Sequence, residues 1–226
     1  MRRVVALLSL AGLLYGSAWS PAATTAARSC GATAYAYAGF SAAERSYGVA
    51  ATLVPLREPE VLNGHVAGWI GVGGPGAGSG GRDEWLQVGM SGFVGKASEL
   101  YYELALPGEA PQYTKITDIG PLERHRIALL EVAGRPSVWQ IWVDSRVVGK
   151  PIYLPDSHRR WAPIATAESW NGGADVCNSY AYRFAGVSSA RKPGGAWRPF
   201  RRGYRFQDPG YRVQVWRSSF TARGRF

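Results

Sequence analysis

The chain has 226 residues, a net charge of +10, two cysteines and three histidines. Its length suits one large all-β domain, and its scattered His and Cys residues lack metal-ligand spacing, so we predict no metal site and no cofactor. The excess charge lies at the end, since residues 191–226 hold ten Lys and Arg against one acid, Asp208, a net of +9. This basic segment could bind an anionic cell-surface polymer, although a solvated arginine-rich surface explains it equally well, and we expect no specific nucleic-acid partner.

Residues 1–27 have the pattern of a cleaved signal peptide: two arginines, an apolar run from Val4 to Tyr15 and small residues beyond it. The run is too short for a membrane anchor, and no later segment resembles a transmembrane helix. We therefore expect a secreted monomer that its basic end could attach to the cell wall. Because exported proteins form disulfides, we also predict a bridge between Cys30 and Cys177.

In the first half of the chain after residue 31, residues 32–40 and 47–59 predict one or two strands followed by a turn, and residues 65–74 and 85–90 predict two further strands. Alternation places the aliphatic residues of the last two on one face: Val66, Ile70, Val72, Leu86, Val88 and Met90. Trp69, Trp85 and Gln87 fall on the opposite face. The glycine-rich run between these strands has no Gly-Lys-Ser/Thr ending and no following helix, so we predict a loop without a phosphate site.

The second half continues the pattern. In residues 99–107, Tyr101 and Glu103 oppose a row of leucines and Tyr102. A turn at Gly120-Pro121 precedes a strand near 127–132. Residues 138–151 predict a hairpin with its tip at Asp144-Ser145 and with Trp142 facing outward. Residues 164–170 set Glu168 opposite small alanines, and strand-like segments continue to the end.

Many short strands separated by turn signals indicate a β-sandwich or barrel. We assign residues 28–190 to one sandwich domain and 191–226 to an arginine-rich C-terminal extension that could belong to the sandwich.

The residues opposite the aliphatic faces form an unusual set: Trp69, Trp85, Gln87, Tyr101, Glu103, Trp142 and Glu168. A sandwich buries one face of each sheet, so large aromatics on the other face indicate a groove for an extended peptide or sugar. An amide such as Gln87 can donate to a carbonyl or a developing oxyanion without changing charge. The simpler interpretation is a polar residue on a solvated sheet face.

Four segments resemble, in their order and spacing, those of the glutamic peptidases or eqolisins: WIGVGG (Trp69–Gly74), WLQVGM (Trp85–Met90), YYELALP (Tyr101–Pro107) and TAESW (Thr166–Trp170). The resemblance covers roughly residues 47–190. It implies an antiparallel jelly-roll sandwich of the concanavalin A type. Gln87 and Glu168 lie 81 residues apart, close to the family's catalytic interval.

By this resemblance Gln87 and Glu168 are the catalytic pair of an endopeptidase, and Trp69 and Glu103 line its cleft. Glu168 would take a proton from water, and Gln87 would hold that water and then donate to the oxyanion. Trp85, Tyr101 and Trp142 complete the expected substrate-binding set. The chain departs from the family's pattern at Gly73, where an Asp is usual, and at Ser169, where an aromatic is common.

Two alternatives remain from the residues alone. The first is a glycan-binding or glycan-cleaving module, because aromatic grooves stack on sugars and two carboxylates, Glu103 and Glu168, could serve glycoside hydrolysis if about 5–9 Å apart. The second is a non-catalytic surface protein that binds through its basic end. A peptidase requires the Gln87 amide and the Glu168 carboxylate to lie within reach of one water.

Overall fold

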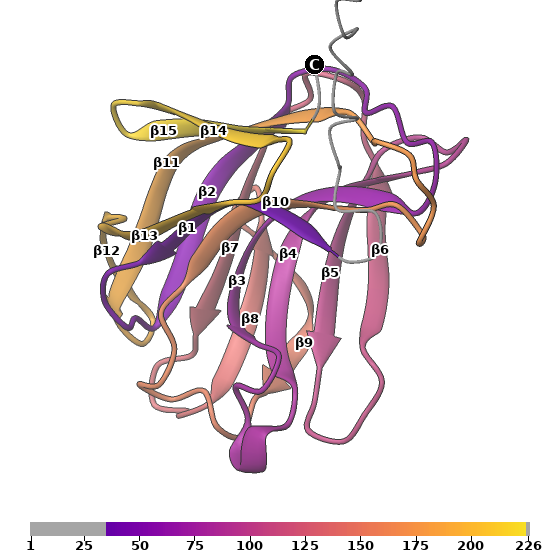
Figure 1. Cartoon of the computed structure of the whole chain (residues 1–226). Helices are drawn as coiled ribbons and strands as arrows, with labels where there is room; N and C mark the ends of the chain where they lie inside the picture. The colour runs from indigo at the N-terminus through magenta and orange to yellow at the C-terminus, as the bar shows by residue number, and fades with distance from the viewer. Residues whose placement is uncertain (1–34, 225–226) are drawn as a thin grey trace, which may run out of the picture.

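The computed structural model describes residues 35–224, which form two antiparallel sheets (Figure 1). We call the seven-stranded sheet, in the order β13-β1-β10-β3-β4-β5-β6, the groove sheet. Its strands are β1 (Ala36–Ala42), β3 (His65–Gly74), β4 (Glu84–Phe93), β5 (Glu99–Ala105), β6 (Gln112–Asp118), β10 (Ile164–Trp170) and β13 (Arg202–Gln207). A short 3-10 helix, η1 (Ser79–Gly81), lies in the loop between β3 and β4.

The second sheet runs in the order β14-β15-β11-β2-β7-β8-β9, and β12 pairs with β11 beside this path. Its strands are β2 (Gly48–Pro55), β7 (His125–Glu131), β8 (Val138–Val143), β9 (Arg146–Tyr153), β11 (Tyr180–Lys192), β12 (Gly195–Pro199), β14 (Tyr211–Trp216) and β15 (Ser219–Gly224). The predicted all-β sandwich of antiparallel sheets is confirmed.

One hydrophobic cluster fills the space between the sheets, and the alternating residues of both sheets supply it. The groove sheet contributes the predicted aliphatic faces of β3 and β4, and the second sheet contributes Trp139 and Ile141 of β8. Ala165 and Ala167 of β10 enter the same cluster. The predicted faces of these strands are therefore confirmed, and the other face of the groove sheet points away from the core.

The hairpin predicted at Asp144-Ser145 is present between β8 and β9. Both residues have positive φ, 48° and 66°, as a two-residue turn that follows strand twist requires. The prediction that Trp142 lines the groove is wrong, because β8 belongs to the second sheet. Trp142 alternates with Trp139 and Ile141, so it points away from the core on that sheet and cannot reach the groove face.

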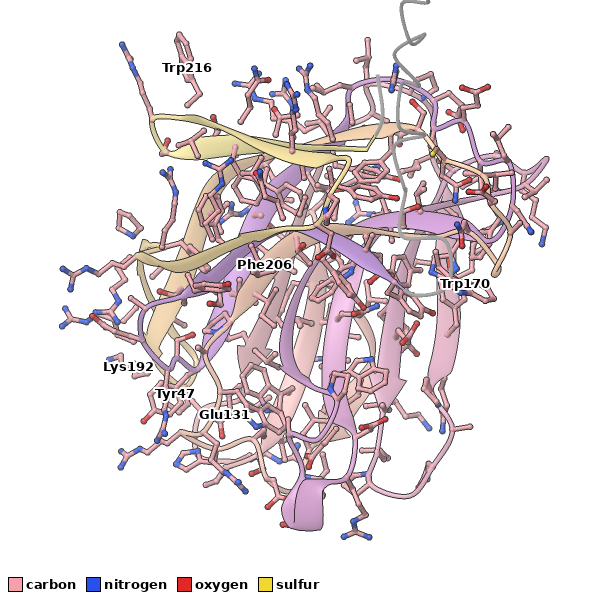
Figure 2. All side chains as sticks on the ribbon, viewed as in Figure 1. Tyr47, Glu131, Trp170, Lys192, Phe206 and Trp216 are labelled. Carbon is pink, nitrogen blue, oxygen red and sulfur yellow. The ribbon has the colours of Figure 1, made fainter. Side chains whose placement is uncertain are left out.

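The basic end of the chain is woven into both sheets. Strand β13 pairs with β1 of the groove sheet, and β15 pairs with β11 of the second sheet. Figure 2 shows Trp216 at the tip of the β14–β15 hairpin, where it is 71% exposed. Of the strands in this segment, β13 and β14 are edge strands of the two sheets, and β15 lies between β14 and β11.

The signal-peptide assignment of residues 1–27 and the cysteine Cys30 lie outside the described residues. The cleaved leader and the Cys30–Cys177 bridge stay predictions. No helix within residues 35–224 is long and apolar enough to cross a membrane.

Candidate active site

The register of the groove sheet aligns the predicted site residues in neighbouring rows. Pairing across β10, β3 and β4 places Thr166 beside Trp69 and Trp69 beside Gly89. The next row, one step along each strand face, runs from Gly71 to Gln87 and on to Glu103. Four strands from distant parts of the sequence thus bring their outward side chains onto one surface.

A cavity of about 740 Å³ opens on this surface. Five of the predicted residues line it: Trp69, Trp85, Gln87, Glu103 and Glu168. Tyr35, Tyr37, Phe206 and Asp208 contribute to its wall, and Gly73, Gly74 and Pro75 form its lip. Its volume is in the range of small-molecule and peptide side-chain sites.

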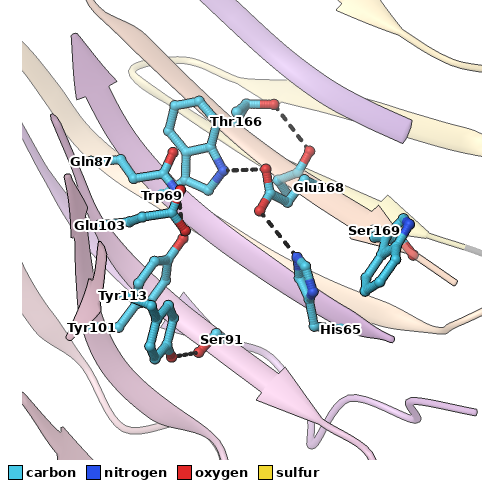
Figure 3. Close-up of polar contacts among 12 residues, drawn as sticks. His65, Trp69, Gln87, Ser91, Tyr101, Glu103, Tyr113, Thr166, Glu168 and Ser169 are labelled. Carbon is cyan, nitrogen blue, oxygen red and sulfur yellow. Dashed lines mark hydrogen bonds and ion pairs between the residues drawn. The ribbon is translucent and has the colours of Figure 1, made fainter. Parts of the chain in front are cut away.

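Glu168 is held by two residues of β3, as Figure 3 shows. The indole Nε1 of Trp69 donates a hydrogen bond to Oε2 at 2.9 Å, and the His65 Nε2 lies 3.6 Å from Oε1. His65 and Trp69 share one strand face because they are four residues apart. Each carboxylate oxygen therefore has its own partner, although Glu168 is only 6% exposed.

Gln87 is fixed from the other side of the cavity floor. Its Nε2 donates to the hydroxyl of Tyr101 at 3.1 Å, and the ring of Tyr101 stacks on Tyr113 with centroids 4.8 Å apart. A methyl group at Gly71 would meet the Trp69 ring at 3.0 Å and the Gln87 Cβ at 3.2 Å. The missing side chain at Gly71 lets the indole and the amide approach each other.

Glu103 is a second carboxylate in the cavity. It accepts a hydrogen bond of 3.1 Å from the Trp85 indole. Burial raises the pKa of Glu103, the bond from Trp85 opposes that shift, and the charge of Glu168 adds to it. Glu103 therefore keeps its proton to a higher pH than an ordinary glutamate does.

Two phenols at the edge of the cavity are uncharged across the working range of most enzymes. Burial raises the pKa of Tyr35 and of Tyr37, and the nearby Glu168 carboxylate raises both further. The backbone N–H of Tyr37 donates to Asp208 at 2.7 Å, which ties β1 to the loop after β13. Part of the cavity wall thus depends on the basic end of the chain.

The structure brings together all the predicted site residues except Trp142. Tyr101 differs from the others because it is 1% exposed and supports Gln87 from below without lining the cavity. Within residues 35–224 no group of three or more His, Cys, Asp and Glu side chains could hold a metal ion.

Sequence reasoning missed His65 as a member of the site. Strand alternation could have placed it on the face of Trp69, but its contact with Glu168 depends on the register of β3 against β10. Tyr35, Tyr37 and Asp208 were missed for the same reason, since β1 and the loop after β13 reach the cavity only through sheet pairing.

No family model and no curated protein matches the chain. Among solved structures, it is similar to a crystal structure of Scytalido-glutamic peptidase with a peptide-based transition-state analog, with a TM-score of 0.55 and 13% sequence identity. That match covers 83% of this chain and 97% of the peptidase. SCP-B, a member of the eqolisin family in complex with the tripeptide Ala-Ile-His, matches with a TM-score of 0.54 and 11% identity over 83% of this chain and 96% of that one. At these identities the likeness establishes a shared fold: the chain has the β-sandwich architecture of these peptidases.

Proposed function

We propose that this protein is a glutamic-type endopeptidase, in which Glu168 activates water and Gln87 stabilises the oxyanion formed on the peptide carbonyl. The observation that carries the proposal is the convergence of Gln87 and Glu168 on one cavity from β4 and β10. Similar solved structures support it, because a peptide-based analog and a tripeptide are bound to proteins of the same fold.

The proposed reaction needs no covalent intermediate. Glu168, ionised, takes a proton from a water molecule as its oxygen attacks the peptide carbonyl. The Gln87 side chain can accept from that water through its carbonyl oxygen and can donate to the oxyanion through an amide N–H. Glu168 then returns the proton to the leaving amine. The hydrogen bond from Trp69 to Oε2 and the contact of His65 with Oε1 hold the Glu168 carboxylate in place at the cavity.

A glycoside hydrolase is the second candidate, and the strand order disfavours it. Its two carboxylates should stand about 5–9.5 Å apart on either side of the scissile bond. Glu103 and Glu168 come from β5 and β10, with β3 and β4 between them, and the register aligns Glu103 with Ile164, four residues along β10 from Glu168. Their backbones therefore stand at least about 14 Å apart at ordinary strand spacing. Each is also held by its own indole, Trp85 or Trp69, rather than aimed at the other.

The decisive experiment is a cleavage assay on a denatured protein substrate from acid to neutral pH, with the Glu168→Gln variant beside the wild type. Cleavage by the wild type alone supports the proposal. Equal cleavage by both proteins rejects the assignment of Glu168. If the protein hydrolyses a polysaccharide and cleaves no peptide, the peptidase proposal is rejected and Glu103 and Glu168 become the candidate acids of a glycoside hydrolase.

We also propose that the mature protein acts outside the cell and contacts an anionic cell-wall polymer through its arginine-rich edge strands. The support is the exposure of Arg212 and Arg217 at the β14–β15 hairpin. Truncation would remove sheet strands, so the matched test is the Arg212→Gln, Arg217→Gln double variant. The double variant should elute from a column of immobilised cell-wall polymer at a lower salt concentration than the wild type. Elution at the same salt concentration rejects this role for the hairpin.

A further inference from the structure

We infer that His65 is a positioning residue whose protonated ring keeps the Glu168 carboxylate ionised in acid and so extends the range of the base to lower pH. The consequence for catalysis rests on the proposed function. The charge pairing between the two side chains does not rest on it and is tested separately below.

The first support is the contact itself. The register of β3 and β10 pairs Ala67 with Glu168, so His65 and Trp69 stand on either side of the glutamate on the same strand face. The distance from His65 Nε2 to Glu168 Oε1 is 3.6 Å, and the indole binds the other oxygen. The neutral indole of Trp69 therefore binds one oxygen of the Glu168 carboxylate, and the imidazole of His65, which can carry a positive charge, contacts the other.

The second support is the shell around the imidazole. The rings of Tyr35, Phe93 and Trp170 surround it, with centroids 5.6, 5.8 and 5.6 Å from that of His65. The side chain of His65 is 19% exposed and that of Glu168 is 8% exposed. Because both side chains of the pair are mostly buried, their charges are screened less than those of a pair at the open surface.

The third support is the balance of charge facing the pair. From β5, Glu103 interacts electrostatically with both His65 and Glu168. From the β1 side, the phenols of Tyr35 and Tyr37 are kept neutral because burial raises their pKa.

The remaining neighbours add no positive charge. Phe93 and Ser91 of β4 are uncharged, and the Glu99 carboxylate of β5 pairs with Lys115 at 3.2 Å. Among residues 35–224, the only ion pair formed by Glu168 within 4 Å is with His65. Protonated His65 is thus the cation placed to pair with the Glu168 carboxylate at 3.6 Å. An opposite charge at this range commonly displaces the titration of a carboxyl group by about 1–3 pH units.

The pairing is tested without any activity by NMR titration of the three histidine rings in the wild type and in Glu168→Gln. Removing the negative charge should make His65 lose its proton at lower pH, by about one unit or more. His125 and His158 serve as internal controls because they pair with other carboxylates: Asp144 and Glu131. An unchanged His65 titration overturns the inference.

The catalytic consequence is tested by the pH profile of kcat/KM for His65→Gln, which keeps an N–H donor but no charge. The acid limb should move to higher pH by about one unit or more, and His65→Lys, which restores a cation, should move it back toward the wild type. The matched control is His125→Gln, which deletes a histidine–carboxylate contact of 2.7 Å on the second sheet and should leave the profile unchanged.

The outcomes separate the two proposals. A lower rate for His65→Gln with an unmoved acid limb assigns the residue to packing and overturns the inference. A wild type that cleaves no peptide at any pH rejects the proposed function, and the NMR titration then decides the charge pairing alone. Circular dichroism establishes that each variant is folded, and the Glu168→Gln titration keeps His65 itself intact.

Discussion

Two buried glutamates of this sandwich each contact a histidine, and their surroundings give them different tasks. Glu168 lies in the groove, where His65 and Trp69 hold it at 3.6 and 2.9 Å. Glu131 ends β7, and its Oε1 accepts hydrogen bonds from the Ser137 backbone N–H at 2.6 Å and from His158 at 2.7 Å. Figure 2 shows Glu131 on the opposite side of the molecule from Trp170, the strand partner of His65.

The two pairs differ in what lies beyond the carboxylate. Glu131 is fully buried and binds a backbone amide, so it fastens the turn after β7 to the loop that carries His158. Glu168 opens onto a cavity that also contains an amide, Gln87. The Glu131–His158 contact, which we call the clasp, is thus structural, whereas the glutamate of the Glu168–His65 contact is a candidate catalytic base. The neighbouring cavity and amide decide between the two roles.

The largest effect should follow from neutralising the groove glutamate. We expect Glu168→Gln to lower peptide hydrolysis by about 10³-fold or more, because it preserves the shape and removes the base. Its free energy of unfolding should remain close to that of the wild type. Turnover measured at saturating substrate, with urea unfolding alongside, checks both statements. If Glu168→Gln keeps its turnover, Glu168 is not the catalytic base.

The next largest effect should follow from removing the amide of Gln87, which lies in the cavity beside Glu168 and has no counterpart near Glu131 in the contacts described above. Gln87→Ala should lower turnover by roughly 10² to 10³, since it removes an oxyanion donor. The losses in the Gln87→Ala, Glu168→Gln double variant should not add, because the two residues act on the same water and carbonyl. Additive losses in a double-mutant cycle of kcat would indicate two independent roles.

A substitution in the clasp, the Glu131–His158 contact, should change the stability of the protein and not its activity. Glu131→Gln removes the charge that accepts bonds from Ser137 and His158, and we expect the free energy of unfolding to fall by about 1.5–3 kcal/mol. Catalysis by the folded variant should be unchanged at a temperature well below its melting point. A variant as stable as the wild type but inactive would reverse the roles given to the two pairs.

A third buried carboxylate gives the smallest effect, and its sign depends on pH. Burial raises the pKa of Glu84, so the stability that this group contributes is present in acid and is lost as the pH rises through the folded-state value. Glu84→Gln should therefore be more stable than the wild type at neutral pH and equal to it in acid.

Glu44 is the matched control for Glu84, because hydrogen bonds from Arg198 lower its pKa. The stability that Glu44 contributes is present at neutral pH and is lost as the pH falls, so Glu44→Gln should lose its effect in acid. Thermal melting of both variants between pH 3 and 8 measures the two trends. Parallel trends would contradict the assigned signs.

The sequence predicted the strands whose two faces differ most. In β3 and β4, alternating residues face either the core or the groove, so both the strands and the position of Gln87 could be derived from period-2 patterning. Strand β6 was not predicted, because it is a largely exposed edge strand with no apolar face for the pattern to reveal.

Patterning also could not say which sheet a strand joins. Trp142 and Trp85 have the same parity relative to their aliphatic neighbours, yet they lie in different sheets. The contact of His65 with Glu168 joins residues about a hundred positions apart, and only the pairing of β3 with β10 creates it. Local sequence fixes the face of a side chain, whereas the neighbours it meets there depend on long-range register.

The glycine-rich lip of the cavity continues into a loop that lies outside the paired part of β3 and β4. Strands β3 and β4 pair without interruption from His65–Phe93 to Gly74–Glu84, so residues 75–83 hang from a closed ladder. A hydrogen bond of 2.7 Å from the Ser79 N–H ties that segment to Asp156, after β9. Lengthening or shortening it would deepen or shorten one wall of the groove while Gln87 and Trp69 keep their places. Under the proposed function, the reach of the groove along a substrate could therefore be engineered in residues 75–83 separately from Gln87 and Glu168.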